Sequence, residues 1–156
     1  MSAKPRMLPE RADFAPAPRG IVLIADDHPD AANSLAMLIE LTGVDAYVAH
    51  DGLQAVELAQ RLRPQLIFMD LGMPRMNGIE ATMRIRREPW GQDILICALT
   101  ALNDSSSRRT TRAAGFDQHL VKPVSFAQID ALLPTPSSIP PTAIRLRGLG
   151  RSRPDR

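Results

Sequence analysis

Short apolar runs alternate with longer segments in which apolar residues recur at helical spacing. The apolar runs predict buried strands at these positions: 21–26, 44–48, 66–69, 94–99 and 119–121. The segments between and after them predict helices: 30–41, 52–63, 79–87, 104–114 and 125–133. Strands and helices in strict alternation form a parallel sheet that is covered on both faces. The pattern therefore predicts an α/β fold, a doubly wound five-stranded parallel sheet with five helices.

Local signals mark the ends and the buried faces of the first two helices. The face of the first helix that packs on the sheet is predicted by apolar side chains: Ala31, Leu35, Leu38 and Ile39. Gly43 follows where a glycine would end that helix. Asp51 is the predicted N-cap of the second helix, which ends before Pro64.

Proline-rich, basic segments at both ends bound the predicted domain. Such segments bury too little apolar surface to offset the entropy of ordering. We expect a disordered arm over 1–19, a folded domain over 20–133 and a disordered proline- and arginine-rich tail over 134–156. The net charge of the whole chain is +2, but residues 21–143 contain ten basic and fourteen acidic residues, a balance of −4. An acidic body argues against nucleic-acid binding by the folded domain.

Hydropathy and cysteine content exclude further classes. The longest unbroken apolar run, 94–99, is far shorter than the roughly 20 residues that a membrane span needs. The N-terminal residues lack the apolar stretch of a secretory signal. Cys97 is the single cysteine, so the chain has no internal disulfide framework. We therefore expect a cytoplasmic protein with no membrane partner.

Carboxylates follow two of the predicted strands at the point where each ends. Asp26 and Asp27 follow the first strand, and Asp70 follows the third. In the flavodoxin-like strand order 2-1-3-4-5 these strands are neighbours, and ligands bind at their carboxyl ends. Three carboxylates that close repel one another unless a cation is present, and a site made of oxygen ligands suits Mg²⁺. We expect a magnesium site here rather than solvated helix caps.

Two more polar residues fall on the same edge of the predicted sheet. Thr100 follows the fourth strand and Lys122 follows the fifth. Lys122 is one of only two lysines in a chain with seventeen arginines, so a lysine at this place is unlike the rest of the basic residues. Pro123 follows it and is a candidate for a cis peptide bond, which would hold Lys122 in a tight turn.

Four segments in this order resemble the receiver domains of two-component response regulators. They are Ile21-Val-Leu-Ile-Ala-Asp-Asp27, Met69-Asp-Leu-Gly-Met-Pro-Arg-Met-Asn-Gly78, Leu99-Thr-Ala101 and Val121-Lys-Pro123. Each segment alone is a weak signal, whereas the four together on the right strand ends are specific. The resemblance covers essentially residues 20–133.

The resemblance implies a role for each residue of the predicted site. Asp70 would be the phosphoacceptor, and Asp27 and Asp70 would hold Mg²⁺ directly. Asp26 would act through water, and the Gly72 carbonyl would be a backbone ligand. The remaining roles fall to three residues that would contact the phosphoryl group: Lys122, Thr100 and Ala101. Thr100 and His119 would be the switch positions, although the family usually has an aromatic residue where this chain has His119.

The resemblance also implies the function and the partners. The chain would accept a phosphoryl group from a histidine kinase or a histidine phosphotransfer protein and change its binding to a downstream protein, as a monomer or weak dimer. It would be a phosphoacceptor and not an enzyme. Gly72 and Leu102 stand where polar side chains often orient the attacking water, so we expect slow self-dephosphorylation.

Alternatives within and outside the family differ in how well they fit. We expect a stand-alone receiver, but the segment 115–124 looks like the receivers of hybrid histidine kinases, and a module or fragment of one stays open. A partner-binding pseudo-receiver also stays open. A flavodoxin-like nucleotide site would need glycines after the first strand, where this chain has Asp-Asp-His-Pro. A haloacid-dehalogenase-type phosphatase would need Asp-X-Asp there, whereas Asp27 and Asp30 are three residues apart.

Overall fold

The computed structural model describes residues 20–101 and 105–134. The expected N-terminal arm, residues 135–156 of the expected tail, Leu102 and the predicted helix start at Asp104 lie outside these residues. Within them the strands are β1 (Ile21–Ala25), β2 (Asp45–Ala49), β3 (Leu66–Asp70), β4 (Leu95–Thr100) and β5 (Gln118–Val121). They form one parallel sheet in the order β2-β1-β3-β4-β5, which confirms the predicted topology.

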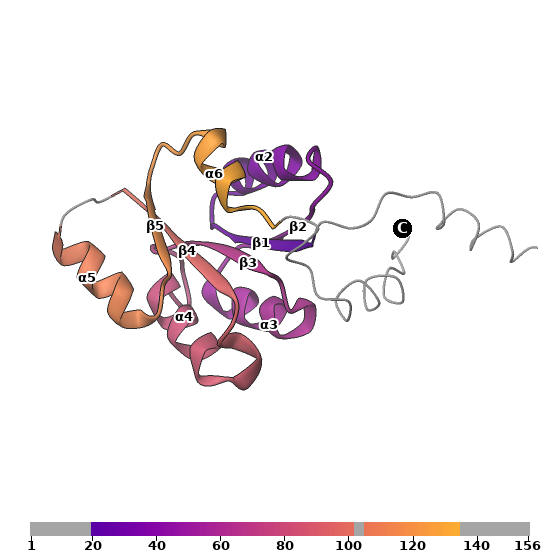
Figure 1. Ribbon diagram of the computed structural model, residues 1–156. Coiled ribbons are helices and arrows are strands. Elements are labelled where there is room, and N and C mark those ends of the chain that lie inside the picture. The colour runs from indigo at the N-terminus through magenta and orange to yellow at the C-terminus, as the bar shows by residue number, and fades with distance from the viewer. Residues whose placement is uncertain (1–19, 102–104, 135–156) are drawn as a thin grey trace, which may run out of the picture.

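The helices form a layer on each face of this sheet. The α-helices in the described residues are α2 (Pro29–Glu40), α3 (Gly52–Leu62), α4 (Gly78–Arg87), α5 (Ser105–Ala114) and α6 (Phe126–Leu132). Helices α2 and α6 cover one face, and α3, α4 and α5 cover the other (Figure 1). A short 3₁₀ turn, η2 (Pro89–Gly91), precedes β4 and was not predicted. No helix in this part of the chain is long and apolar enough to cross a membrane.

Alternate side chains of the central strands supply two separate cores. The core under α3, α4 and α5 contains Leu23, Ala25, Ile67, Met69, Ile96 and Ala98. The core under α2 and α6 contains Val22, Ile24, Leu66, Phe68, Cys97 and Leu99. A strand that is buried on both faces needs apolar residues at every position, which explains why the sequence shows unbroken runs there.

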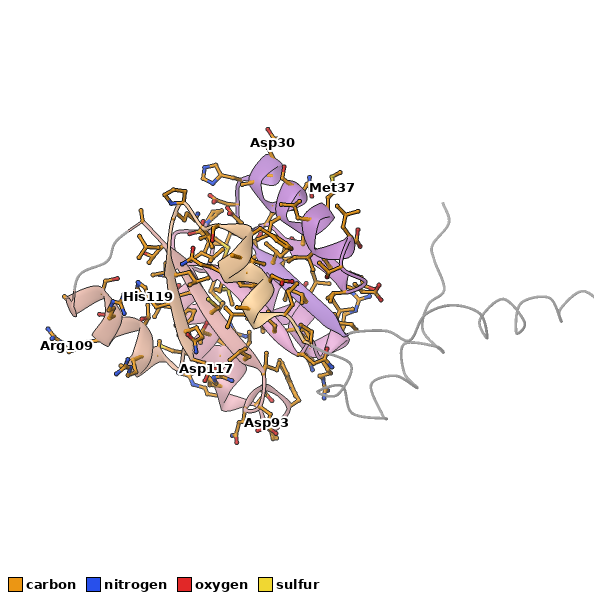
Figure 2. All side chains as sticks on the ribbon, turned by 45° about the horizontal axis from the view of Figure 1, so that its top comes forward. Asp30, Met37, Asp93, Arg109, Asp117 and His119 are labelled. Atoms are coloured by element: carbon orange, nitrogen blue, oxygen red, sulfur yellow. The ribbon has the colours of Figure 1, made fainter. Side chains whose placement is uncertain are left out.

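The predicted buried face of α2 was partly wrong. Leu35 and Ile39 pack on the sheet as expected, but Ala31 is exposed and Leu38 is 45% exposed. Ala32 and Ala36 take their places in the core. The buried stripe keeps Leu35 and Ile39, and its centre is rotated by only ~65° around the helix axis. The helix lies against the sheet on its small alanine side chains, and larger apolar side chains such as Met37 point away from the domain (Figure 2).

The first turn of α3 is in close contact with the loop between β3 and α4. Gly52 is buried, and a Cβ atom at this position would contact the backbone carbonyl oxygen of Met76. Asp51 caps the helix as predicted, because its side chain accepts a hydrogen bond of 2.8 Å from the Gln54 amide. Glycine at residue 52 thus allows the loop that follows Asp70 to approach α3.

Replacing this glycine tests the close approach. Gly52→Ala should lower the free energy of unfolding by about 1–3 kcal/mol, because the added methyl group would force backbone apart. Gly72→Ala, in the loop that Gly52 contacts, is the matched control, since an added Cβ there meets no atom within 4 Å. Its effect should stay within about 0.5 kcal/mol. Equal effects of the two substitutions in urea unfolding would contradict the packing described.

Candidate functional site

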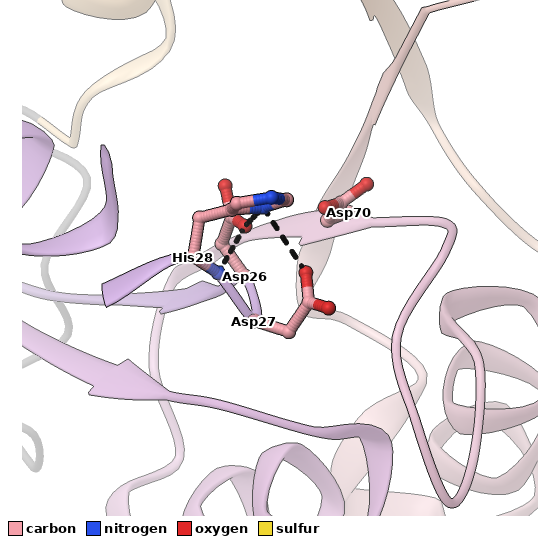
Figure 3. Close-up of side chains that lie close together, drawn as sticks. All are labelled: Asp26, Asp27, His28 and Asp70. Atoms are coloured by element: carbon pink, nitrogen blue, oxygen red, sulfur yellow. Dashed lines mark hydrogen bonds and ion pairs between the residues drawn. The ribbon is translucent and has the colours of Figure 1, made fainter. Parts of the chain in front are cut away.

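Carboxylates from β1 and β3 meet at one edge of the sheet. Strands β1 and β3 are hydrogen-bonded neighbours with Ala25 opposite Met69, so the residues that follow these two lie side by side. Asp26, Asp27, His28 and Asp70 each offer a ligand atom, and these atoms all lie within 4.8 Å of one another (Figure 3). The strand order predicted for a flavodoxin-like sheet therefore brings the three predicted acids together.

Lys122 provides positive charge to this cluster from the far side of β4. Its Nζ lies 3.4 Å from Asp70 Oδ2 and 3.7 Å from Asp26 Oδ2. The Lys122 amide donates a 2.8 Å hydrogen bond to the Thr100 carbonyl, which ties the end of β5 to β4. The peptide bond between Lys122 and Pro123 is cis. The ammonium group thus contacts the buried carboxylates of Asp26 and Asp70, at the ends of β1 and β3.

Burial has the largest effect on the pKa of Asp70. Removal of its carboxyl group from water raises the pKa above the usual value, the Lys122 charge opposes this effect, and the nearby Asp26 charge adds to it. Its Oδ1 also accepts a long hydrogen bond, 3.4 Å, from the Gly72 amide. The pKa of Asp70 is raised overall, so the single ammonium group does not fully compensate the ionised carboxylate.

The oxygen atoms of the cluster suit a divalent cation. Asp26 is buried, and its Oδ1 accepts a 2.9 Å hydrogen bond from the His28 amide. Asp27 Oδ1 is a buried atom that receives no hydrogen bond from the described residues, although His28 Nδ1 lies 3.3 Å from it. Buried oxygens without a donor are rare in proteins, and a cation satisfies them. Closely spaced carboxylate oxygens are the ligands that Mg²⁺ prefers, so the residues present fit this ion.

Three other predicted site residues lie on the same edge of the sheet as the cluster. Thr100 is the last residue of β4, between the strand that ends at Asp70 and the strand that precedes Lys122. Only 5% of Thr100 is exposed. Ala101 follows and is exposed. Gly72 is exposed in the loop after β3. The structure thus groups Thr100, Ala101 and Gly72 on the edge that carries the acids.

His119 makes a contact of another kind. It lies in β5, and its Nδ1 is 3.3 Å from the Thr111 hydroxyl of α5. Thr111 is buried, whereas His119 is only partly covered (Figure 2). This residue therefore connects β5 to α5 and does not join the group of carboxylates.

Sequence reasoning missed His28 as a member of the cluster. Its Nδ1 lies 3.3 Å from Asp26 Oδ1 and 3.3 Å from Asp27 Oδ1, which are the dashed contacts in Figure 3. A search for paired histidines at ligand spacing does not find such a residue, because its neighbours are carboxylates. The available signal was its position directly after the acidic pair at the end of a buried strand.

An ion pair between Asp51 and Arg75 was also missed. Arg75 Nε donates to Asp51 Oδ2 at 3.1 Å, with Arg75 in the left-handed region at φ 66°. The hydrogen bond from the Gln54 amide, together with Arg75, holds the pKa of Asp51 below its usual value. Since Arg75 belongs to the loop that contains Gly72, this contact anchors that loop to α3.

Comparisons with known proteins identify the family of this chain. The sequence profile of the "Response regulator receiver domain" family matches residues 22–133. The chain therefore belongs to this family and is a receiver domain of two-component response regulators. This finding confirms the resemblance inferred from the four sequence segments.

Particular relatives include a transcriptional regulator and an uncharacterised protein. The chain is 33% identical over 126 residues to the "DNA-binding dual master transcriptional regulator RpaA" of Synechocystis sp.; the match covers 78% of this chain but 52% of RpaA. It thus spans about half the length of that relative. It is also 35% identical over 103 residues to an "Uncharacterized 14.6 kDa protein" of Leptolyngbya boryana, covering 66% of this chain and 79% of that protein.

Solved structures agree with the fold. The receiver domain of sensor histidine kinase PA1611 from Pseudomonas aeruginosa, which has a magnesium ion coordinated in its active-site cleft, is 30% identical with a TM-score of 0.67. That match covers 72% of this chain and 93% of the PA1611 domain. Chemotaxis protein CheY4 of Vibrio cholerae is 26% identical with a TM-score of 0.68, and the match covers 72% and 98% of the two chains.

The raised pKa of Asp70 predicts how stability depends on pH without metal. The native state keeps a proton on Asp70 at pH values where the unfolded chain has lost it. The free energy of unfolding should therefore fall as pH rises from the unfolded pKa, about 3.9, through the native pKa. Asp70→Asn should remove this fall and be more stable than the unchanged chain at pH 7 in chelator, by urea unfolding.

Asp93→Asn is the control for this experiment, because Asp93 is an exposed carboxylate away from the cluster. It should leave both stability and its pH dependence unchanged within about 0.5 kcal/mol. A chain with Asp70→Asn that is no more stable than the unchanged chain at pH 7 would show that the Asp70 charge is fully compensated.

Proposed function

We propose that Asp70 accepts a phosphoryl group from a histidine kinase or a histidine phosphotransfer protein, in a reaction that requires Mg²⁺. The observation that carries this proposal is the close group of Asp26, Asp27 and Asp70, of which Asp26 and Asp70 are buried, with Lys122 Nζ 3.4 Å from Asp70. A group of this kind has the carboxylate nucleophile and the positive charge that phosphoryl transfer needs.

The transfer requires positioning more than covalent chemistry by the protein. A carboxylate oxygen of Asp70 forms the new bond to phosphorus, the bond from phosphorus to the donor nitrogen breaks, and the released imidazole takes up a proton. Asp27 and Asp70 would hold the metal directly, Asp26 through water and Gly72 through its carbonyl. The ion would supply positive charge that neutralises the phosphoryl oxygens.

Other residues of the edge bind the phosphoryl oxygens in this proposal. Lys122 shifts from its contact with Asp70 to the incoming phosphoryl group, which its half-exposed side chain allows. The Thr100 hydroxyl and the Ala101 amide donate hydrogen bonds to it. Thr100 then moves toward Asp70, and the change reaches β5 and α5 through the switch position His119, which contacts Thr111.

The outcome of phosphorylation is altered binding of a downstream protein. We place the receiver domain at 20–133, between an N-terminal arm and a C-terminal tail, in a cytoplasmic monomer or weak dimer that is not an enzyme. Gly72 leaves open space beside Asp70 and offers no side chain to orient water, so we expect slow loss of the phosphoryl group. A receiver module of a hybrid histidine kinase is the second candidate, favoured by the likeness to the PA1611 domain.

Phosphorylation can be measured directly by intact-mass spectrometry of the full chain. A small phosphodonor such as acetyl phosphate should add one phosphoryl group with Mg²⁺ present and none in chelator, because the site sets three carboxylates against the one ammonium group of Lys122. Asp70→Asn should abolish the addition, whereas Asp93→Asn should leave it unchanged. An added phosphoryl group on Asp70→Asn would refute the choice of nucleophile, and no addition to the unchanged chain by either small or protein donors would favour a pseudo-receiver.

A further inference from the structure

One side chain of the acidic cluster has no part in the proposed phosphoryl transfer. His28 follows Asp27 and is the N-cap residue of α2, whose first residue is Pro29. Its amide donates to Asp26 Oδ1 at 2.9 Å, and its carbonyl accepts a 3.0 Å hydrogen bond from the Ala32 amide. The backbone of His28 is thus held on both sides, so its imidazole starts from a fixed point beside the carboxylates.

The position of the imidazole fits a metal ligand. Nδ1 lies 3.3 Å from Asp27 Oδ1 and 3.3 Å from Asp26 Oδ1. Two adjacent ligand atoms on one octahedral ion, each bonded at about 2.1 Å, lie ~3.0 Å apart. The spacing of Nδ1 and Asp27 Oδ1 is therefore close to that of two ligands that share an ion. The 3.3 Å between Nδ1 and Asp26 Oδ1 is the distance of a hydrogen bond, which Nδ1 gives up when it binds the ion.

We infer that His28 Nδ1 is a ligand of the metal ion at this centre, so that the chain favours transition-metal ions such as Mn²⁺ and Zn²⁺ over Mg²⁺ more than a centre of carboxylates alone would. The inference rests on the proposed metal centre and adds a residue to it. Imidazole nitrogen suits transition ions, whereas Mg²⁺ prefers oxygen. His28 thus changes which ion binds, while the carboxylates provide the charge.

The exposure of the ring agrees with this role. The His28 side chain is 74% exposed and Asp26 only 6%, so the imidazole lies at the mouth of the cluster and the carboxylate at its base. Rotation about the side chain can place Nδ1 on an ion or withdraw it without disturbing the core. Mg²⁺ can therefore bind with water in that position, which matches its preference for retaining water ligands.

Pulsed electron paramagnetic resonance of the Mn²⁺-loaded full chain, prepared without a histidine tag, tests the ligand directly. We expect nitrogen modulation from a coordinated imidazole in the unchanged chain and none in His28→Ala. His50→Ala is the matched control, because His50 is an exposed histidine outside the cluster, and it should keep the modulation. Asp27→Ala should lose tight Mn²⁺ binding altogether, which locates the ion.

Calorimetric titration measures the preference among ions. His28→Ala should weaken Zn²⁺ binding by at least about tenfold and change the dissociation constant of Mg²⁺ by less than about twofold. Modulation that persists in His28→Ala, or a substitution that weakens all ions equally or tightens them, would overturn the inference. A tightening of every ion would identify His28 as a competing positive charge.

The two proposals fail separately. Nitrogen modulation in a chain that takes no phosphoryl group would leave the ligand assignment in place and remove the proposed function. Mg²⁺-dependent phosphorylation of Asp70 in a chain without that modulation would do the reverse.

Discussion

Burial of carboxylates at one edge of the sheet, beside a single lysine, is the constraint on which the site depends. Asp26 and Asp70 are buried, and the parallel pairing of β1 with β3 keeps their carboxylates close together. Lys122 contacts both, yet the pKa of Asp70 remains raised because its burial outweighs the contact. In the proposal, a divalent cation supplies the missing positive charge, and a phosphoryl group is then accepted where that charge is concentrated. The fold therefore maintains an arrangement that is unfavourable without a ligand.

The surrounding structure keeps this edge in place. Both faces of the central strands are buried, so β1 and β3 cannot shift relative to each other without exposing apolar side chains. The loop after Asp70 is held by the Arg75 to Asp51 ion pair and by the close approach of Gly52 to the Met76 carbonyl. Lys122 is tied to β4 through the Thr100 carbonyl. Each contact fixes one of the segments that carry the charged groups, which is how a rigid scaffold positions loop residues.

Periodicity and strand ends predicted most of this arrangement. Each predicted boundary within the described residues lies within one residue of the observed one, because buried parallel strands and capped helices leave strong local signals. Once the strand order is known, the ends of those strands place Asp26, Asp70 and Lys122 at one edge of the sheet. The buried face of α2 was misplaced, since Leu38 and Ala36 are both apolar and only the packing on the sheet distinguishes them. The Arg75 to Asp51 pair joins residues 24 positions apart, and no local pattern records such a contact. His28 contacts its chain neighbours Asp26 and Asp27, so its position directly after the acidic pair was a local signal that the sequence analysis did not use.

The most direct test of the account is the titration of the Asp70 carboxyl carbon by nuclear magnetic resonance, first in chelator and then with saturating Mg²⁺. Without metal, the account predicts a pKa for Asp70 above the ordinary value of about 3.9. With Mg²⁺ the pKa should fall, because the ion favours the charged carboxylate. An Asp70 pKa at or below the ordinary value in chelator, unchanged by Mg²⁺, would contradict the claim that uncompensated carboxylate charge defines this site.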